Sequence, residues 1–117
     1  MPASKRRKPR PSKDPGSPAA EAIRRIGIEC RLVIVKNLLD RPMRFNELLK
    51  IGIGIDPKTL SRVLKYLASE EIVHRDVVST APFAVQYSLT EKGMQLKPVI
   101  DSLETWGERW VTSQTNL

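Results

Sequence analysis

Residues 56–67 read Asp56-Pro57-Lys58-Thr59-Leu60-Ser61-Arg62-Val63-Leu64-Lys65-Tyr66-Leu67 and begin with two helix-start signals. Asp56 can act as N-cap by accepting an unpaired backbone N–H, and proline suits the first helical position because its missing N–H costs nothing there. Apolar side chains then recur at the spacing of one helical face. They are Leu60, Val63, Leu64 and Leu67. The sequence therefore predicts an amphipathic helix that runs to about Glu70.

The opposite side of this predicted helix is called its outer face below. At about 100° per residue, it consists of Lys58, Ser61, Arg62, Lys65 and Ser69. It carries three cations, two hydroxyls and no acidic group. Cations and hydroxyls together suit phosphates and base edges. The competing interpretation is the solvated charged face of an ordinary surface helix.

The preceding residues predict two further helices. The first runs from about Ala19 to Leu39, and Gly27 in its interior marks either close packing or a break that would make the first half a separate short helix. The second is short, from Met43 to Lys50, and residues 51–55 connect it to the helix at 56. The glycines of this connection do not form a phosphate-binding loop, because no Gly-Lys-Ser/Thr sequence follows and no strand leads in. A helix, a short connection and a second helix with a basic outer face indicate a helix-turn-helix unit.

A β-hairpin is predicted after this unit. Residues 72–78 are rich in β-branched side chains, residues 79–83 contain the turn signal Pro82, and residues 84–89 alternate apolar and polar. A hairpin after the recognition helix is typical of the winged form of helix-turn-helix. The wing would present Arg75, Ser79, Thr80 and Gln86 to DNA, although Arg75 could instead pair with Asp76 or Glu71.

A final helix is predicted from Thr90, its N-cap. Leu96, Val99, Leu103, Trp106 and Trp110 are spaced 3, 4, 3 and 4 residues apart, a heptad seam of the kind that packs along another helix. Pro98 should kink this helix or delay its regular part. The tryptophans could belong to the core, but the earlier elements already fill a small core, so we favour a dimer interface. The predicted interface residues are Ile23, Ile26, Leu96, Val99, Leu103, Trp106 and Trp110.

The net charge of +7 over 117 residues is uneven. Residues 1–18 hold six basic residues against Asp14, a net charge of +5, whereas residues 19–117 hold fourteen basic and twelve acidic residues. The first 18 residues also include five prolines and no large apolar residue after Met1, so we predict a disordered basic tail. It could contact DNA, solubilise the chain or act as a nuclear-localisation signal. Its candidate DNA contacts are Lys5, Arg6, Arg7, Lys8 and Arg10.

Composition also excludes several classes of protein. A single cysteine excludes an intramolecular disulfide and a cysteine-cluster zinc site, and no apolar run approaches the roughly 18 residues that span a bilayer. The only histidine, His74, has no evident catalytic partner, and no catalytic triad, paired-carboxylate or metal-ligand pattern is present. We therefore predict a cytoplasmic, nucleoid-associated protein that is not an enzyme and has no cofactor or metal. The charge points first to nucleic acid as partner and only second to an anionic membrane.

Several motifs resemble one known family. They are Arg44-Phe45-Asn46-Glu47-Leu48, the segment 55–61 (IDPKTLS), the segment 81–93 (APFAVQYSLTEKG) and Trp106-Gly107. Together the sequence from about Ile26 to Trp110 resembles the HxlR group of winged-helix transcription regulators of bacteria and archaea, relatives of the MarR group. The resemblance implies a homodimer through the first and last helices, with two recognition helices in successive major grooves. It also implies DNA contacts by Arg44, by the outer face of 58–65 and by Arg75.

The sequence departs from the family in one place. The family usually has a Gly-Lys-Trp run in its first helix, and Ile28-Glu29-Cys30 stands at that position here. Some members sense oxidants through a cysteine just before the first helix, where this chain has none. Cys30 lies on the apolar stripe instead, so we predict that it is buried in the core rather than a sensor, which should be exposed with a lowered pKa.

The sequence thus predicts a mainly α fold with a small β-hairpin, a winged helix-turn-helix of residues 19–117 preceded by the tail of residues 1–18. The leading hypothesis is a homodimeric, sequence-specific regulator that binds double-stranded DNA. Its recognition residues would be Lys58, Thr59, Ser61, Arg62 and Lys65, with Arg44, Arg75, Ser79 and Thr80 on the backbone or in the wing. The alternatives are an architectural nucleoid protein with little sequence preference, and a winged helix that contacts another protein. No residues point to a small-molecule effector.

Overall fold

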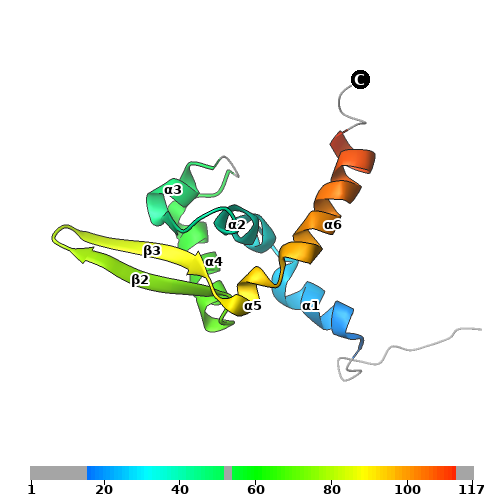
Figure 1. Ribbon diagram of the computed structural model, residues 1–117, viewed down its shortest axis with the longest axis horizontal. Coiled ribbons are helices and arrows are strands. Elements are labelled where there is room, and N and C mark those ends of the chain that lie inside the picture. Colours follow the sequence, from blue (N-terminus) through cyan, green and yellow to red (C-terminus); the bar gives the residue numbers. More distant parts are fainter. Residues whose placement is uncertain (1–15, 52–53, 113–117) are drawn as a thin grey trace, which may run out of the picture.

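The computed structural model describes residues 16–51 and 54–112 and shows a helical body with a protruding hairpin (Figure 1). The elements are α1 (Pro18–Ile26), α2 (Arg31–Leu38), β1 (Met43–Arg44), α3 (Phe45–Leu49), α4 (Pro57–Ser69), β2 (Val73–Thr80), β3 (Phe83–Leu89), α5 (Glu91–Met94), α6 (Lys97–Gly107) and the π-helical turn η1 (Glu108–Thr112). The mainly α, winged helix-turn-helix class predicted from the sequence is confirmed.

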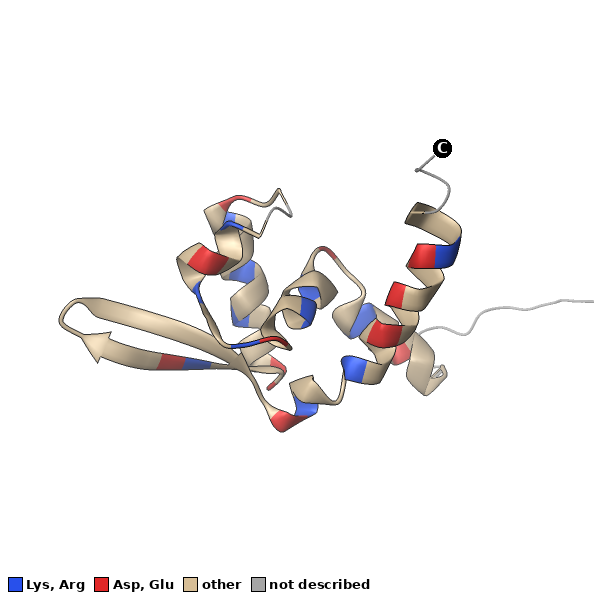
Figure 2. Ribbon diagram, turned by 45° about the horizontal axis from the view of Figure 1, so that its top comes forward, with Lys and Arg blue, Asp and Glu red and all other residues tan. Residues whose placement is uncertain are grey.

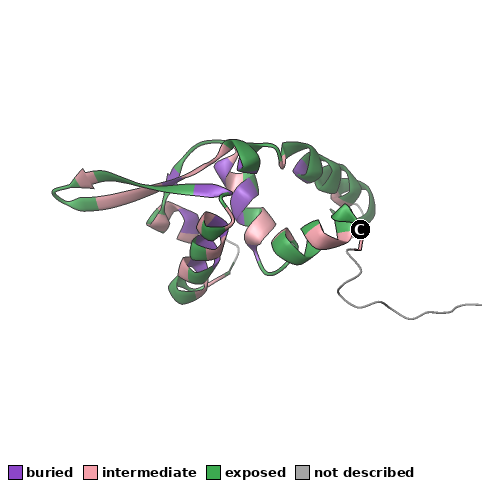
Figure 3. Ribbon diagram, turned by 90° about the horizontal axis from the view of Figure 1, so that it is seen from below, coloured by how far each residue is buried: buried purple, intermediate pink, exposed green. Residues whose placement is uncertain are grey.

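The core lies where α2, α3 and α4 meet the base of the sheet, as the buried segments of Figure 3 show. The apolar face predicted for α4 is confirmed, because all four of its residues are at most 1% exposed. Leu48 of α3 and Ile34 and Val35 of α2 are fully buried against them. Ile51 and Ile55, at the two ends of the connection between α3 and α4, pack against this cluster. Aliphatic side chains thus supply most of the burial that stabilises the fold.

The predicted single helix from Ala19 to Leu39 is wrong, and the alternative break at Gly27 is confirmed. α1 ends at Ile26 and α2 begins at Arg31, with Gly27 as the C-cap of α1. A side chain at position 27 would place its Cβ 2.7 Å from the Ile23 carbonyl oxygen, so glycine allows this tight end of α1. The start of α1 is one residue earlier than predicted, because Ser17 caps the helix and Pro18 occupies its first turn.

The hairpin belongs to a three-stranded antiparallel sheet of order β1-β3-β2. The predicted helix from Met43 is wrong in its first two residues, because Met43 and Arg44 form β1 and pair with Tyr87 and Gln86 of β3. The predicted turn of residues 79–83 is also too long. β2 continues to Thr80, which pairs with Phe83, so only Ala81 and Pro82 form the turn.

The predicted helix from Thr90 is two helices. Thr90 caps α5 as predicted, accepting a hydrogen bond from the Gly93 backbone N–H at 3.0 Å. α5 ends at Met94, and α6 begins at Lys97 with Pro98 in its first turn, so this proline delays the long helix and does not kink it. Ile100 is the buried residue of α6. α1 and α6 each contact the core near one end, through Ile26 and Ile100, and are otherwise largely exposed (Figures 1 and 3). No helix among the described residues is long and apolar enough to cross a membrane.

Candidate nucleic-acid interface

The candidate interface is centred on α4, and Asp56 caps the first turn of this helix. The Thr59 backbone N–H donates to Asp56 Oδ1 at 2.7 Å, which makes Asp56 the N-cap that the sequence predicted. This hydrogen bond lowers the pKa of the Asp56 carboxyl, since it stabilises the ionised form. The cap therefore sets where α4 begins and which residues its first two turns present to solvent.

We expect this cap to make the fold acid-sensitive. Because its pKa is lowered in the folded state, ionised Asp56 contributes stability above its ordinary pKa, and that contribution is lost as pH falls through the lowered value. Asp56→Asn keeps a capping side chain but cannot titrate. Thermal melts between pH 7 and pH 3 should show the advantage of the native chain over Asp56→Asn shrinking toward acid. A constant difference across that range would contradict this role for the carboxylate.

The outer face of α4 is exposed and free of acidic residues. Lys58, Arg62 and Lys65 are exposed, and Thr59 and Ser61 are half-buried at its edges. Figure 2 shows basic and no acidic positions along α4. The predicted recognition residues thus lie on one surface. The half-buried hydroxyl residues Thr59 and Ser61 have less room to reach a ligand than the three exposed cations.

One acidic side chain from outside α4 does reach the outer face. Arg62 Nη2 lies 2.6 Å from Oε2 of Glu29, in the segment between α1 and α2. The sequence analysis missed this pair, since the two residues are 33 positions apart. The signal in the sequence was that residues 28–30 depart from the run that the resemblance implies.

The sheet register places Arg44 and Arg75 on opposite faces. Arg44 pairs across strands with Gln86, which pairs with Asp76, whereas Arg75 pairs with Tyr87, the partner of buried Met43. Cross-strand partners share a face and successive residues alternate, so the two arginines point to different sides of the sheet. Both are exposed, and among the described residues Arg75 makes no ion pair with Asp76 or Glu71.

The outer part of the hairpin is uncharged (Figure 2). Thr80 is exposed and Ser79 is half-buried, with its Oγ accepting a hydrogen bond from the Ala81 backbone N–H at 3.4 Å. Phe83 and Val78 are exposed beside them. The wing can therefore offer hydroxyl and apolar contacts at its tip, while its only Arg, Arg75, stands nearer the base. The tail residues Lys5, Arg6, Arg7, Lys8 and Arg10 lie outside the described residues.

An exposed apolar stripe runs along α6 and η1. This C-terminal stripe consists of Val99, Leu103, Trp106 and Trp110, and the exposed fraction of Trp106 is 59%. Ile23 of α1 is exposed as well. Ile26 and Leu96, which we predicted at the same interface, are half-buried and pack against the core of the protomer. Among the residues that the structure describes, the stripe thus stays exposed, as a surface for another molecule would be.

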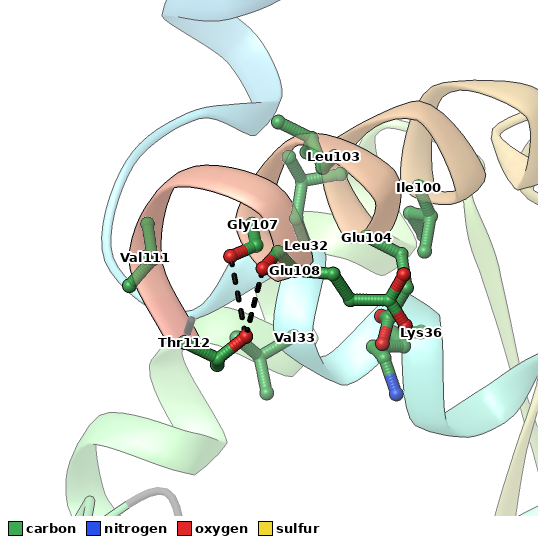
Figure 4. Close-up of a pocket in the computed structure, with 10 residues that line it drawn as sticks. All are labelled: Leu32, Val33, Lys36, Ile100, Leu103, Glu104, Gly107, Glu108, Val111 and Thr112. Atoms are coloured by element: carbon green, nitrogen blue, oxygen red, sulfur yellow. Dashed lines mark hydrogen bonds between the residues drawn. The ribbon is translucent and has the colours of Figure 1, made fainter. Parts of the chain in front are cut away.

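A pocket of about 360 Å³ separates this C-terminal region from α2 (Figure 4). Leu32, Val33 and Lys36 line one wall, and residues of α6 and η1 line the other. Thr112 Oγ1 donates back toward the Gly107 and Glu108 carbonyl oxygens at 3.4 and 3.3 Å, which holds the η1 turn at the end of the pocket. The pocket thus lies between the winged body and the stripe-bearing helix.

The predicted burial of Cys30 is confirmed. Its exposed fraction is 8%, and burial raises the pKa of the thiol. A thiol in this state is the opposite of the exposed, low-pKa sensor. Within the described ranges, no group of three or more His, Cys, Asp or Glu residues could hold a metal ion.

Comparison with known proteins gives the family. The model described as HxlR-like helix-turn-helix matches residues 26–115. The chain belongs to this family. Among curated relatives, it is 35% identical over 95 residues to the uncharacterized HTH-type transcriptional regulator YdeP of Bacillus subtilis, an alignment that covers 81% of this chain and 74% of YdeP. The resemblance inferred from the sequence motifs is thus confirmed.

Solved structures agree. The redox regulator HypR in its reduced form superposes with a TM-score of 0.76 at 34% identity, covering 84% of this chain and 99% of HypR. The reduced form of the transcriptional regulator YodB from B. subtilis gives a TM-score of 0.71 at 33% identity, covering 81% of this chain and 94% of YodB. This HxlR-family chain is therefore a helix-turn-helix protein of the transcription-regulator class.

Proposed function

We propose that this HxlR-family protein is a sequence-specific transcription regulator that binds double-stranded DNA as a homodimer. The observation that carries the proposal is the outer face of α4, where a capped helix presents three cations and two hydroxyl side chains with no acid of its own. A recognition helix with this chemistry fits the major groove, where its first turns reach base edges. The β2–β3 hairpin projects from the helical body (Figure 1), so Ser79 and Thr80 near its tip can meet the DNA backbone.

The residues divide into two roles. Lys58 and Lys65, as flexible point charges, suit phosphates, whereas the planar guanidinium of Arg62 suits the O6 and N7 acceptors of guanine. Arg44, the N-cap residue of α3, would add a contact to the DNA backbone. Arg75 can reach DNA only from the other face of the sheet, so it would contact a different strand segment from Arg44.

A homodimer is supported by the C-terminal stripe. Exposed tryptophan and leucine side chains on one helix form the kind of apolar patch that marks an interface. Ile23 of α1 is also an exposed apolar side chain, which is consistent with pairing through the first and last helices. Two copies would carry two α4 helices, which in a dimer read half-sites about 34–36 Å apart.

The test is a salt series of duplex binding with the full-length protein. It uses the DNA upstream of the protein's own gene, a scrambled duplex of equal length, and a full-length variant in which the five basic tail residues are glutamine. A preference of about a thousandfold for the upstream DNA, retained by the tail variant, is expected of a winged domain that reads sequence. No preference, with affinity that collapses in the tail variant, would refute the regulator and favour an architectural protein.

Substitutions on α4 should separate base reading from phosphate binding. Arg62→Ala should weaken binding to the preferred DNA by about 1–3 kcal/mol and affect scrambled DNA less, as a bidentate guanine contact requires. Lys65→Ala should weaken both duplexes alike and lower the salt slope by about one, as loss of a phosphate contact does. Titrations of both duplexes at three salt concentrations measure both effects. Equal losses on the two duplexes for Arg62→Ala would assign it to a phosphate instead.

A further inference from the structure

We propose that Glu29 is a specificity-determining residue that positions Arg62 for base recognition and keeps it from acting as a free cation on phosphates. The proposal rests on the proposed function and deepens it. It concerns a carboxylate that lies outside the helix-turn-helix unit in sequence and reaches the outer face of α4 in space.

The backbone presents Glu29 from a constrained segment. Its φ is 56°, in the left-handed region that non-glycine residues seldom adopt. The next residue, Cys30, is buried, and its carbonyl oxygen accepts a hydrogen bond from the Ile34 backbone N–H at 3.0 Å. The Arg31 side chain donates to the Arg25 carbonyl oxygen at 2.8 Å and lies 3.5 Å from the centroid of the Tyr66 ring on α4. The segment that carries Glu29 is thus tied to α4 independently of the Glu29 side chain.

The ion pair itself orients one arginine. Glu29 Oε2 accepts from a single terminal nitrogen, Nη2 of Arg62, at 2.6 Å. The guanidinium has five N–H groups, so this bond restricts where its head lies and leaves donors for a second acceptor. The two side chains are 36% and 58% exposed, and an ion pair so open to solvent adds little to fold stability. Its effect is therefore expected in DNA binding, where a pre-oriented arginine loses less freedom on contact.

The carboxylate also changes what Arg62 can do on the wrong DNA. Non-specific binding comes from cations that displace counterions from phosphates, and a paired arginine beside a negative charge contributes less to it. Glu29 thus places a negative charge directly beside Arg62 on the outer face of α4. Oriented readout and weaker non-specific binding both widen the gap between preferred and random DNA.

Glu29→Gln tests this in the full-length protein, because it removes the charge and keeps the shape. We expect affinity for the scrambled duplex to rise about threefold or more, and the preference for the upstream DNA to fall about tenfold, a factor within the range of one bidentate base contact. Glu29→Asp, which keeps the charge, should retain more of the preference. With Arg62→Lys already present, Glu29→Gln should no longer lower the preference, because a lysine has no plane to orient.

Glu71→Gln is a matched control. Glu71 also has a left-handed φ, 61°, is exposed and follows the opposite end of α4. The substitution Glu71→Gln removes the same charge and should leave the preference for the upstream DNA unchanged. A preference that Glu29→Gln leaves unchanged would overturn the proposal. If both duplexes then bind more tightly by the same factor, Glu29 acts only as a repulsive charge and does not position Arg62. Absence of any preference in the native protein would instead refute the regulator itself. Thermal melts of each variant show that the fold is intact.

Discussion

Gly93→Ala should lower the free energy of unfolding by about 3 kcal/mol, the upper part of the range for overpacking a tight site. A Cβ at position 93 would overlap the Ile72 carbonyl oxygen, a backbone atom, and would lie 3.1 Å from Leu89 Cδ2. The carbonyl cannot move away easily, because it accepts from the Thr90 backbone N–H at 3.0 Å, while the Ile72 N–H donates to the Leu67 carbonyl at 2.9 Å. α5 would have to shift away from the base of β2.

Gly107→Ala is the matched control for the same added methyl group. Within the described protomer, a Cβ at position 107 meets nothing within 4 Å, and alanine is favoured over glycine in a helix by about 1 kcal/mol. Urea unfolding of both variants at one protomer concentration measures the difference. If Gly93→Ala lowers the free energy of unfolding by less than about 1 kcal/mol, α5 adjusts freely, contrary to its tight packing against Ile72 and Leu89.

Local signals explain which elements could be predicted from the sequence. The sequence predicts the bounds of α4 closely, because the N-cap, the proline of the first turn and the apolar face all lie within residues 56–67. Met43 and Arg44 carry no such signal, since they become a strand only by pairing with Tyr87 and Gln86, more than forty positions away. The length of the hairpin was missed for a related reason. Cross-strand pairing overrides the turn propensity of Ser79 and Thr80, and propensity is a weak guide where tertiary contacts decide.

The candidate site divides in the same way. The outer face of α4 follows from helical periodicity alone, so its residues were found together. The Glu29–Arg62 pair joins two segments that meet only in the folded chain, and no spacing rule could have predicted it. The separation of Arg44 from Arg75 depends on sheet register, because a slip of one residue would bring both side chains to the same face. Ile26 and Leu96 have apolar periodicity whether they face a partner or the core, so the sequence could not assign them.

The largest effect on DNA binding is expected from Trp106→Glu. Trp106 is exposed at the middle of the C-terminal stripe, so the substitution should leave the protomer folded. In the proposed homodimer, it would bury an unpaired charge between two apolar helices, a cost that an interface does not recover. The protein should therefore sediment as a monomer at concentrations where the native chain is a dimer, with an unchanged far-UV circular dichroism spectrum.

Loss of the dimer should weaken binding to the upstream DNA by at least about a hundredfold, because the second α4 then binds as an independent molecule and not at the high effective concentration set by the first. The matched control is Thr105→Glu, which adds the same charge one residue away. Thr105 is not a member of the stripe, and its Oγ1 donates to the Asp101 carbonyl oxygen at 3.1 Å. A dimer that persists in Trp106→Glu would remove the stripe from the interface. A monomer that still binds the upstream DNA with native affinity would refute the two-half-site arrangement, since one α4 would then account for all of the recognition.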